Sequence, residues 1–120
     1  MINANELRIG NYINVYDGVG PKYMYQVTGY DIDEIDGDGT DCFPIPLTPE
    51  ILEKCGAEKE HNGWYKISIC NDWSYIFWER RACFELSVNK HSIMLTNIQY
   101  LHQLQNLYFA LTNSELTFKL

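Results

Sequence analysis

The one long segment of this sequence with a clear helical period lies near the C-terminus, at residues 99–113. Its apolar side chains recur every three or four residues, as one face of a helix requires: Leu101, Leu104, Tyr108 and Leu111. Thr96 is a suitable N-cap, and Asn113 suits the left-handed residue that ends many helices. The pattern predicts a long C-terminal helix near residues 97–112, with the domain packed on its apolar face.

This region carries no formal charge. Between His91 and Ser114 there is no Asp, Glu, Lys or Arg, so the polar side of the helix has only amide and imidazole groups: Gln99, His102, Gln103 and Asn106. Two interpretations stay open. The neutral side hydrogen-bonds within the fold, as buried polar groups do, or it binds a partner, because interface cores are depleted of charge. A membrane span is not expected, since polar residues interrupt every turn.

Length and composition indicate one globular domain. The chain has 120 residues, of which 46% are hydrophobic and 14% aromatic, enough to bury a core. A Pro-rich stretch at residues 43–49 marks the only candidate sub-domain boundary within residues 1–120. The net charge of −7 opposes non-specific binding to nucleic acid, which requires Lys and Arg to neutralise phosphates.

The cysteines and the N-terminus indicate a cellular compartment. The four cysteines contain no C-x-x-C pair, which disfavours a zinc ribbon: Cys42, Cys55, Cys70 and Cys83. The first residues lack the basic and apolar regions of a signal peptide. We therefore expect a reduced, cytoplasmic protein without metal or cofactor, and an even cysteine count leaves a secreted protein as the alternative.

Alternating residues predict a fold that is α+β and mainly antiparallel. Residues 7–16 and 22–30 form a first hairpin that resembles the start of a small SH3-like barrel. A β-meander follows, with short turns between its strands: residues 64–70, 73–79, 83–88 and 92–95. The alternation at residues 116–120 predicts that a strand ends the chain.

Two further segments precede the meander. Thr48 as N-cap, Pro49 in the first turn and Gly56 at the end predict a short docking helix near residues 48–56. The acidic residues 31–41 suggest calcium, but the EF-hand spacing fails, because Asp36 stands where that loop requires glycine. We expect an acidic loop, with irregular calcium binding as the alternative.

No sequence motif indicates catalysis, so we do not predict an enzyme, and an enzyme of unknown type is the third alternative after the two binding functions below. Aromatic residues crowd the meander, and three of them are candidates to anchor a protein partner together with the neutral helix face: Trp64, Trp73 and Trp78. The alternative function is binding of single-stranded nucleic acid, with stacking on these aromatics and phosphate contacts from the nearby basic residues: Lys66, Arg80 and Arg81.

Three segments resemble a family of small uncharacterised proteins from Bacteroides-type bacteria and their phages or prophages. They are Asn-Glu-Leu-Arg-Ile-Gly-Asn-Tyr at residues 5–12, Pro-Ile-Pro-Leu-Thr at residues 44–48 and Tyr-Leu-His-Gln-Leu-Gln-Asn-Leu-Tyr-Phe-Ala-Leu-Thr at residues 100–112. The resemblance implies a mobile-element origin and no particular activity. We expect a virion accessory or host-interaction protein, in the bacterial cytoplasm or a phage particle, with a protein partner or a second copy of itself.

Overall fold

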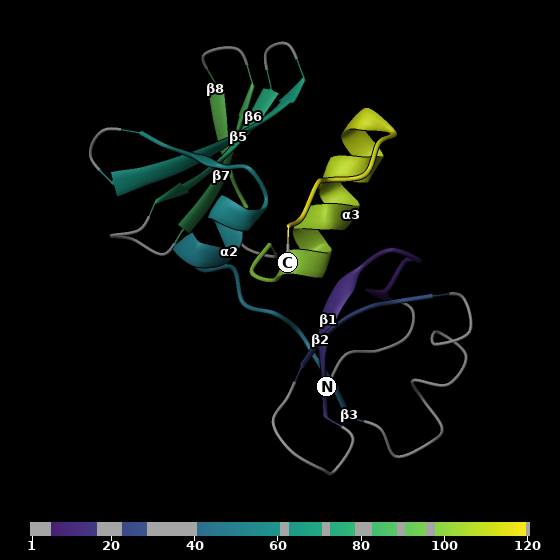
Figure 1. The fold of residues 1–120 in the computed structure, drawn as a ribbon. Coiled ribbons are helices and arrows are strands. Elements are labelled where there is room, and N and C mark those ends of the chain that lie inside the picture. The colour runs from purple at the N-terminus through teal and green to yellow at the C-terminus, as the bar shows by residue number, and fades with distance from the viewer. Residues whose placement is uncertain are drawn as a thin grey trace.

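The computed structural model has two antiparallel sheets and two helices among the residues that it describes, so the fold is mixed α+β (Figure 1). It is elongated, with principal extents of 47 × 28 × 24 Å. The described residues are 6–16, 23–28, 41–60, 63–70, 73–78, 83–88, 91–95 and 98–119.

The N-terminal sheet has the strand order β2-β1-β3. Its strands are β1 (Tyr12–Tyr16), β2 (Tyr23–Gln26) and β3 (Asp41–Phe43). β1 begins later than the sequence predicts, because Gly10 has a φ of +98° and turns the chain just before it. A small hydrophobic cluster lies behind this sheet: Leu7, Ile13, Val15, Val27 and Cys42. Most of the acidic segment, at residues 31–40, lies outside the described residues.

A short helix follows the Pro-rich connector. Helix α2 (Pro49–Lys54) has Thr48 as its N-cap, and the Thr48 Oγ1 accepts the Ile51 N–H at 3.3 Å. Six residues make too short a helix to be stable alone. α2 is therefore held by its buried face, in which Leu52 is fully buried.

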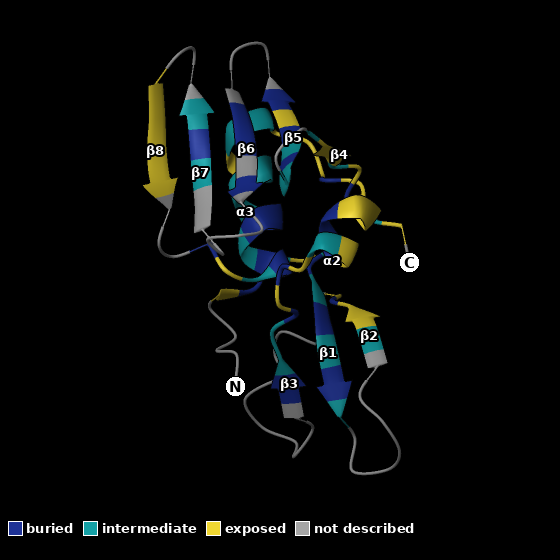
Figure 2. Ribbon diagram, turned by 90° about the vertical axis from the view of Figure 1, so that its left-hand side faces the viewer, coloured by how far each residue is buried: buried dark blue, intermediate teal, exposed yellow. Residues whose placement is uncertain are grey.

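The second sheet is a five-stranded antiparallel meander with the order β4-β5-β6-β7-β8. Its strands are β4 (Glu58–Lys59), β5 (Trp64–Cys70), β6 (Trp73–Trp78), β7 (Cys83–Val88) and β8 (His91–Leu95). Side chains alternate between its faces. Figure 2 shows α2 and α3 on one side of this sheet, where the main core lies.

Helix α3 (Leu101–Thr112) is shorter than the predicted helix, which was expected to begin near residue 97. Its N-cap is Tyr100, and Thr96 lies outside the described residues. The Leu47 N–H donates to the Gln99 carbonyl at 3.1 Å, and the Leu101 N–H donates to the Ile45 carbonyl at 2.8 Å. Residues 99 and 100 thus pair with the extended connector, which prevents them from joining the helix.

The predicted C-terminal strand is wrong for residues 116–119, which have no regular secondary structure. The segment is held by packing instead. Leu116 is buried in the main core, and the Phe118 ring lies 4.8 Å from that of Tyr12, centroid to centroid. The Lys119 N–H donates to the Lys54 carbonyl at 2.9 Å, which ties the end of the chain to α2.

Candidate interaction surfaces

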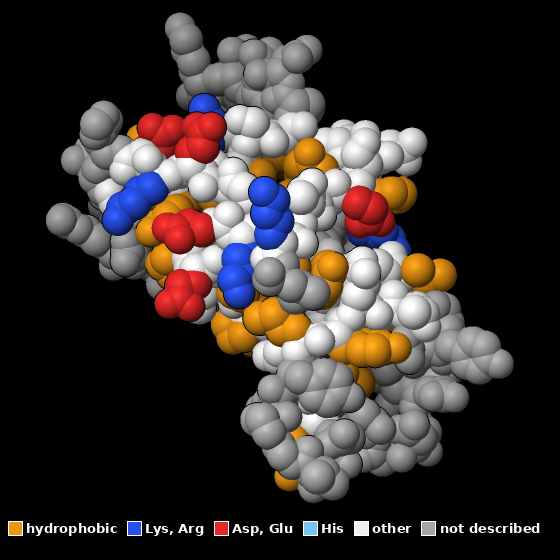
Figure 3. Space-filling model, in the orientation of Figure 1, with side chains coloured by type: hydrophobic (Ala, Val, Ile, Leu, Met, Phe, Trp, Pro, Cys, Tyr) orange, Lys and Arg blue, Asp and Glu red, His pale blue; other side chains and the backbone are white. Residues whose placement is uncertain are grey.

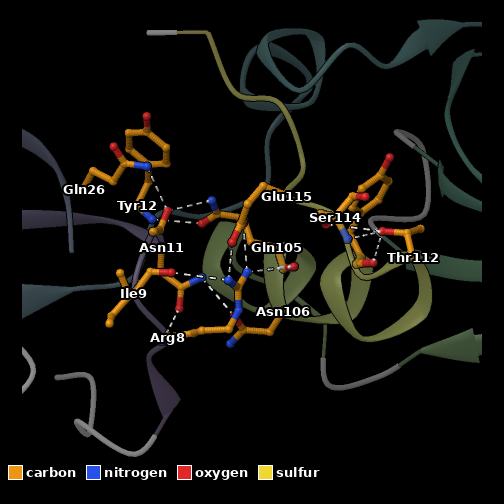
Figure 4. Close-up of polar contacts among 12 residues, drawn as sticks. Arg8, Ile9, Asn11, Tyr12, Gln26, Gln105, Asn106, Thr112, Ser114 and Glu115 are labelled. Carbon is orange, nitrogen blue, oxygen red and sulfur yellow. Dashed lines mark hydrogen bonds and ion pairs between the residues drawn. The ribbon is translucent and has the colours of Figure 1, made fainter. Parts of the chain in front are cut away.

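The polar face of α3 is bound to the segment that leads into β1 (Figure 4). Gln105 is 1% exposed, and its side-chain Oε1 accepts the Tyr12 N–H at 2.9 Å. Its Nε2 donates to the Gly10 carbonyl at 3.2 Å. One buried amide therefore binds a backbone donor and a backbone acceptor on the side of this segment that does not pair with β2.

Asn106, one turn from His102 on the predicted partner surface, extends this contact. Its Oδ1 accepts from Asn11 Nδ2 at 2.9 Å, and its Nδ2 donates to the Glu6 carbonyl at 3.1 Å. Asn11 is itself buried, and its Oδ1 accepts the Arg8 N–H at 2.6 Å. Asn11 and Asn106 thus fasten the N-terminal segment to α3 through their side-chain amides.

Arg8 adds a charged contact to this joint. Its guanidinium forms an ion pair with Glu115, with Nη2 3.0 Å from Oε2. The guanidinium carbon also lies 4.3 Å from the centroid of the Phe109 ring. The hydrogen bond from Arg8 lowers the pKa of Glu115. Since the Glu115 side chain is half exposed, this pair orients the segment more than it stabilises the fold.

Gln103 and Gln99 lie where α3 begins. The Gln103 Oε1 accepts the Gln99 N–H at 2.8 Å and the Tyr100 N–H at 3.1 Å, so this side chain binds backbone groups that precede the first turn. The neutral side of the helix therefore makes hydrogen bonds within the fold at Gln103, Gln105 and Asn106. Its use as a partner surface stays a prediction.

His102 is buried beneath a shallow surface depression. The side chain is 1% exposed, and neither ring nitrogen has a hydrogen-bond partner in the described part of the chain. Glu6 Oε1 lies 3.8 Å from Nε2. The depression has a volume of about 420 Å³, is open to solvent, and is lined by Glu6, Ile98, His102, Gln103, Asn106 and Leu107. Burial lowers the pKa of His102, although the Glu6 carboxylate raises it, so the ring is held neutral.

This burial predicts a loss of stability in mild acid. A histidine in the unfolded chain takes up a proton below its ordinary pKa of about 6.5, whereas folded His102 takes it up only at lower pH. The contribution of His102 is therefore complete above pH 6.5 and declines as the pH falls towards the folded-state pKa. Urea unfolding between pH 7.5 and 5 should show a weaker decline for His102→Gln than for the parent protein.

Glu6→Gln provides the matched comparison. It removes the carboxylate that offsets the burial of His102, so the decline below pH 6.5 should become steeper. Equal pH slopes for the parent protein and both variants would contradict the assigned environment of His102.

The predicted aromatic and basic sites are only partly described. Trp64 is half-buried on β5 and is the Cα partner of Trp78 on β6, whereas Trp73 is the Cα partner of Cys70 and Val88. The side chains of Trp73 and Trp78 lie outside the described residues, as do Arg80 and Arg81 in full.

Lys66 is described, and acidic residues lie near it in the sheet. It is half-buried on β5 and is the Cα partner of Glu58 on β4 and of Ile76 on β6. Ile76 is in turn paired with Glu85, so this row of the sheet carries two carboxylates for one ammonium group. Basic and acidic side chains are also interspersed on the face shown in Figure 3. This arrangement does not favour phosphate binding.

The outer strand β8 exposes two neighbouring large apolar side chains. Ile93 is 57% exposed and Met94 is 60% exposed, and they point to opposite faces of the sheet. β8 contains no Asp, Glu, Lys, Arg or Pro. It was predicted as a strand but not as a site. The charge-free region that begins at His91 includes it, so the signal was present and was assigned to the helix alone.

Comparison with protein-family models, curated proteins and solved structures gives no match to this chain. Among the described residues there is no group of three or more His, Cys, Asp or Glu side chains that could hold a metal ion. No described helix is long and apolar enough to cross a membrane. Burial raises the pKa of the Cys55 thiol to about 12, so this cysteine is protonated and a weak nucleophile at neutral pH.

Proposed function

We propose that this protein is a non-enzymatic protein-interaction module that adds an extended protein segment to the outer edge of β8. The observation that carries the proposal is this edge. It ends a five-stranded sheet, no described strand pairs with its outer side, and its central residues expose apolar side chains on both faces.

Sheet edges are templates for another strand, since every second residue directs an N–H and a C=O outward. Soluble proteins usually protect such an edge with Lys, Pro, a bulge or a covering loop. β8 has neither Lys nor Pro within it, and its residues 91–94 are exposed. Strand addition would satisfy the backbone groups, and Ile93 and Met94 would supply apolar contacts on either face.

The origin and location in this proposal rest on the resemblance at residues 5–12, 44–48 and 100–112. It supports a phage or prophage protein that acts as a virion accessory or host-interaction protein, in the bacterial cytoplasm or within a particle. The SH3-like character of the N-terminal hairpin belongs to the same proposal, supported by the antiparallel pairing of β1 and β2.

Site-specific photo-crosslinking tests the proposal. A photoreactive amino acid in place of Met94 should form covalent adducts with protein when the purified chain is irradiated in lysate of a Bacteroides-type bacterium. The same group in place of Glu53, exposed on α2, is the control and should give at least about tenfold fewer adducts. Equal labelling from both positions, or none from Met94, would overturn binding at β8.

A further inference from the structure

The apolar row on the core face of the meander is incomplete at its β8 end. Ile67, Tyr75, Leu86 and Ile93 are consecutive Cα partners across β5, β6, β7 and β8. The first three are buried, whereas Ile93 is 57% exposed. Figure 2 shows the reason: α3 lies behind the middle of the sheet, and residues 91–94 of β8 are exposed at its edge. A further strand added at this edge would continue the apolar row.

The backbone register shows which groups of β8 are available. Val88 and His91 are Cα partners separated by two residues, so they form the hydrogen-bonded pair that closes a tight hairpin. Pairs then alternate, and Leu86 with Ile93 is the next hydrogen-bonded pair. The N–H and C=O groups of Ser92 and Met94 are therefore those directed away from β7.

We propose that the occupant of this edge is a second copy of the same chain, whose β8 pairs antiparallel with the first about a two-fold axis at Ile93. This inference rests on the proposed function and names the partner of that site. Two-fold pairing places Ile93 opposite its counterpart, and Ser92 opposite Met94 of the other copy. Ser92 and Met94 are the residues whose backbone N–H and C=O groups point outward. Pairing about this axis therefore lets Ser92 of each copy exchange hydrogen bonds with Met94 of the other.

Side-chain chemistry favours a like strand over a charged one. Ile93 opposite Ile93 completes the core-face rows of both sheets, which become one continuous sheet across the two copies. The chain has a net charge of −7, so most surfaces of two copies repel one another. β8 has no Asp, Glu, Lys or Arg. Its one histidine, His91, would lie opposite Leu95 of the other copy, so no like charges meet at the axis.

Substitution of Ile93 by residues of opposite charge tests the proposed pairing of two β8 strands. Sedimentation of the parent protein over a range of concentrations should show a monomer–dimer equilibrium, because five paired residues form a small interface. Ile93→Lys and Ile93→Glu should each weaken association at least tenfold, since like charges would meet across the two-fold axis. An equimolar mixture of these two variants should recover association as a heterodimer.

The control is Ser68→Lys, an exposed position on the interior strand β5, which should leave the equilibrium unchanged. Circular dichroism should show that all variants retain the parent fold. A parent chain that stays monomeric, or variants that dimerise like the parent, would overturn the inference. In either case, adducts from Met94 to another protein would leave the proposed function standing. A monomeric parent chain together with no adducts from Met94 would remove both.

Discussion

Leu52→Ala is expected to lower the free energy of unfolding by about 3–5 kcal/mol, the largest single effect that we predict. Leu52 is fully buried in the main core, and it lies on a helix of six residues. The substitution creates a cavity and removes the contact that holds α2 against the meander, because so short a helix has little stability of its own. Urea unfolding followed by tryptophan fluorescence would measure the loss.

The neighbouring residue on the same helix is the control. Glu53 is exposed, so Glu53→Ala should change the free energy of unfolding by less than about 0.5 kcal/mol. A loss below about 1 kcal/mol for Leu52→Ala would contradict the packing of α2 described above.

Gln105→Leu should cost about 1–3 kcal/mol of folding free energy. Leucine fills much of the same space but leaves the Tyr12 N–H without an acceptor, whereas the Gly10 carbonyl keeps the hydrogen bond from Gln26. Each unsatisfied buried group costs about 1–3 kcal/mol. Chemical denaturation measures the total, and hydrogen exchange at the Tyr12 amide should accelerate because that donor has lost its acceptor.

Gln26→Leu is a matched comparison, since Gln26 Nε2 also donates to the Gly10 carbonyl, at 3.3 Å, but from an exposed side chain. Water can replace that hydrogen bond, so the variant should lose less than about 1 kcal/mol. Similar losses for the two variants would mean that the burial of Gln105 is not what makes its hydrogen bonds important.

The amide contacts of α3 and the exposed edge of β8 have different roles and lie in different parts of the molecule. The amides of α3 and the segment before β1 join the N-terminal sheet to the rest of the chain. The β8 edge lies at the far side of the meander from that sheet (Figures 1 and 2). Gln103 and Asn106, which the sequence predicts as part of a partner surface, make hydrogen bonds within the fold, while the proposed partner edge is at Ile93 and Met94.

Local features of the sequence predict the meander well. Strands such as Trp64–Cys70 and Cys83–Val88 are set by alternation of apolar and polar residues and by the short connections between them, and both are properties of neighbouring residues. Thr48 and Pro49 mark the start of α2 in the same way, since capping acts within one turn. The absence of charge after His91 is likewise a property of the sequence, and it extends over the whole of β8.

Contacts between segments distant in the sequence decided where α3 begins, how the final segment packs and which glutamine is buried. α3 begins at Leu101 because residues 99–101 pair with the connector, and the final segment packs on α2 and Tyr12 despite its strand-like alternation. Gln105 acts on Tyr12 from 93 positions away, and no local pattern could single it out from the other glutamines. The sequence alone determined which segments form strands and where charge is missing. Only the tertiary structure decided which neutral groups are used within the fold and which edge is left exposed, because hydrogen bonding and burial depend on residues that the chain brings together when it folds.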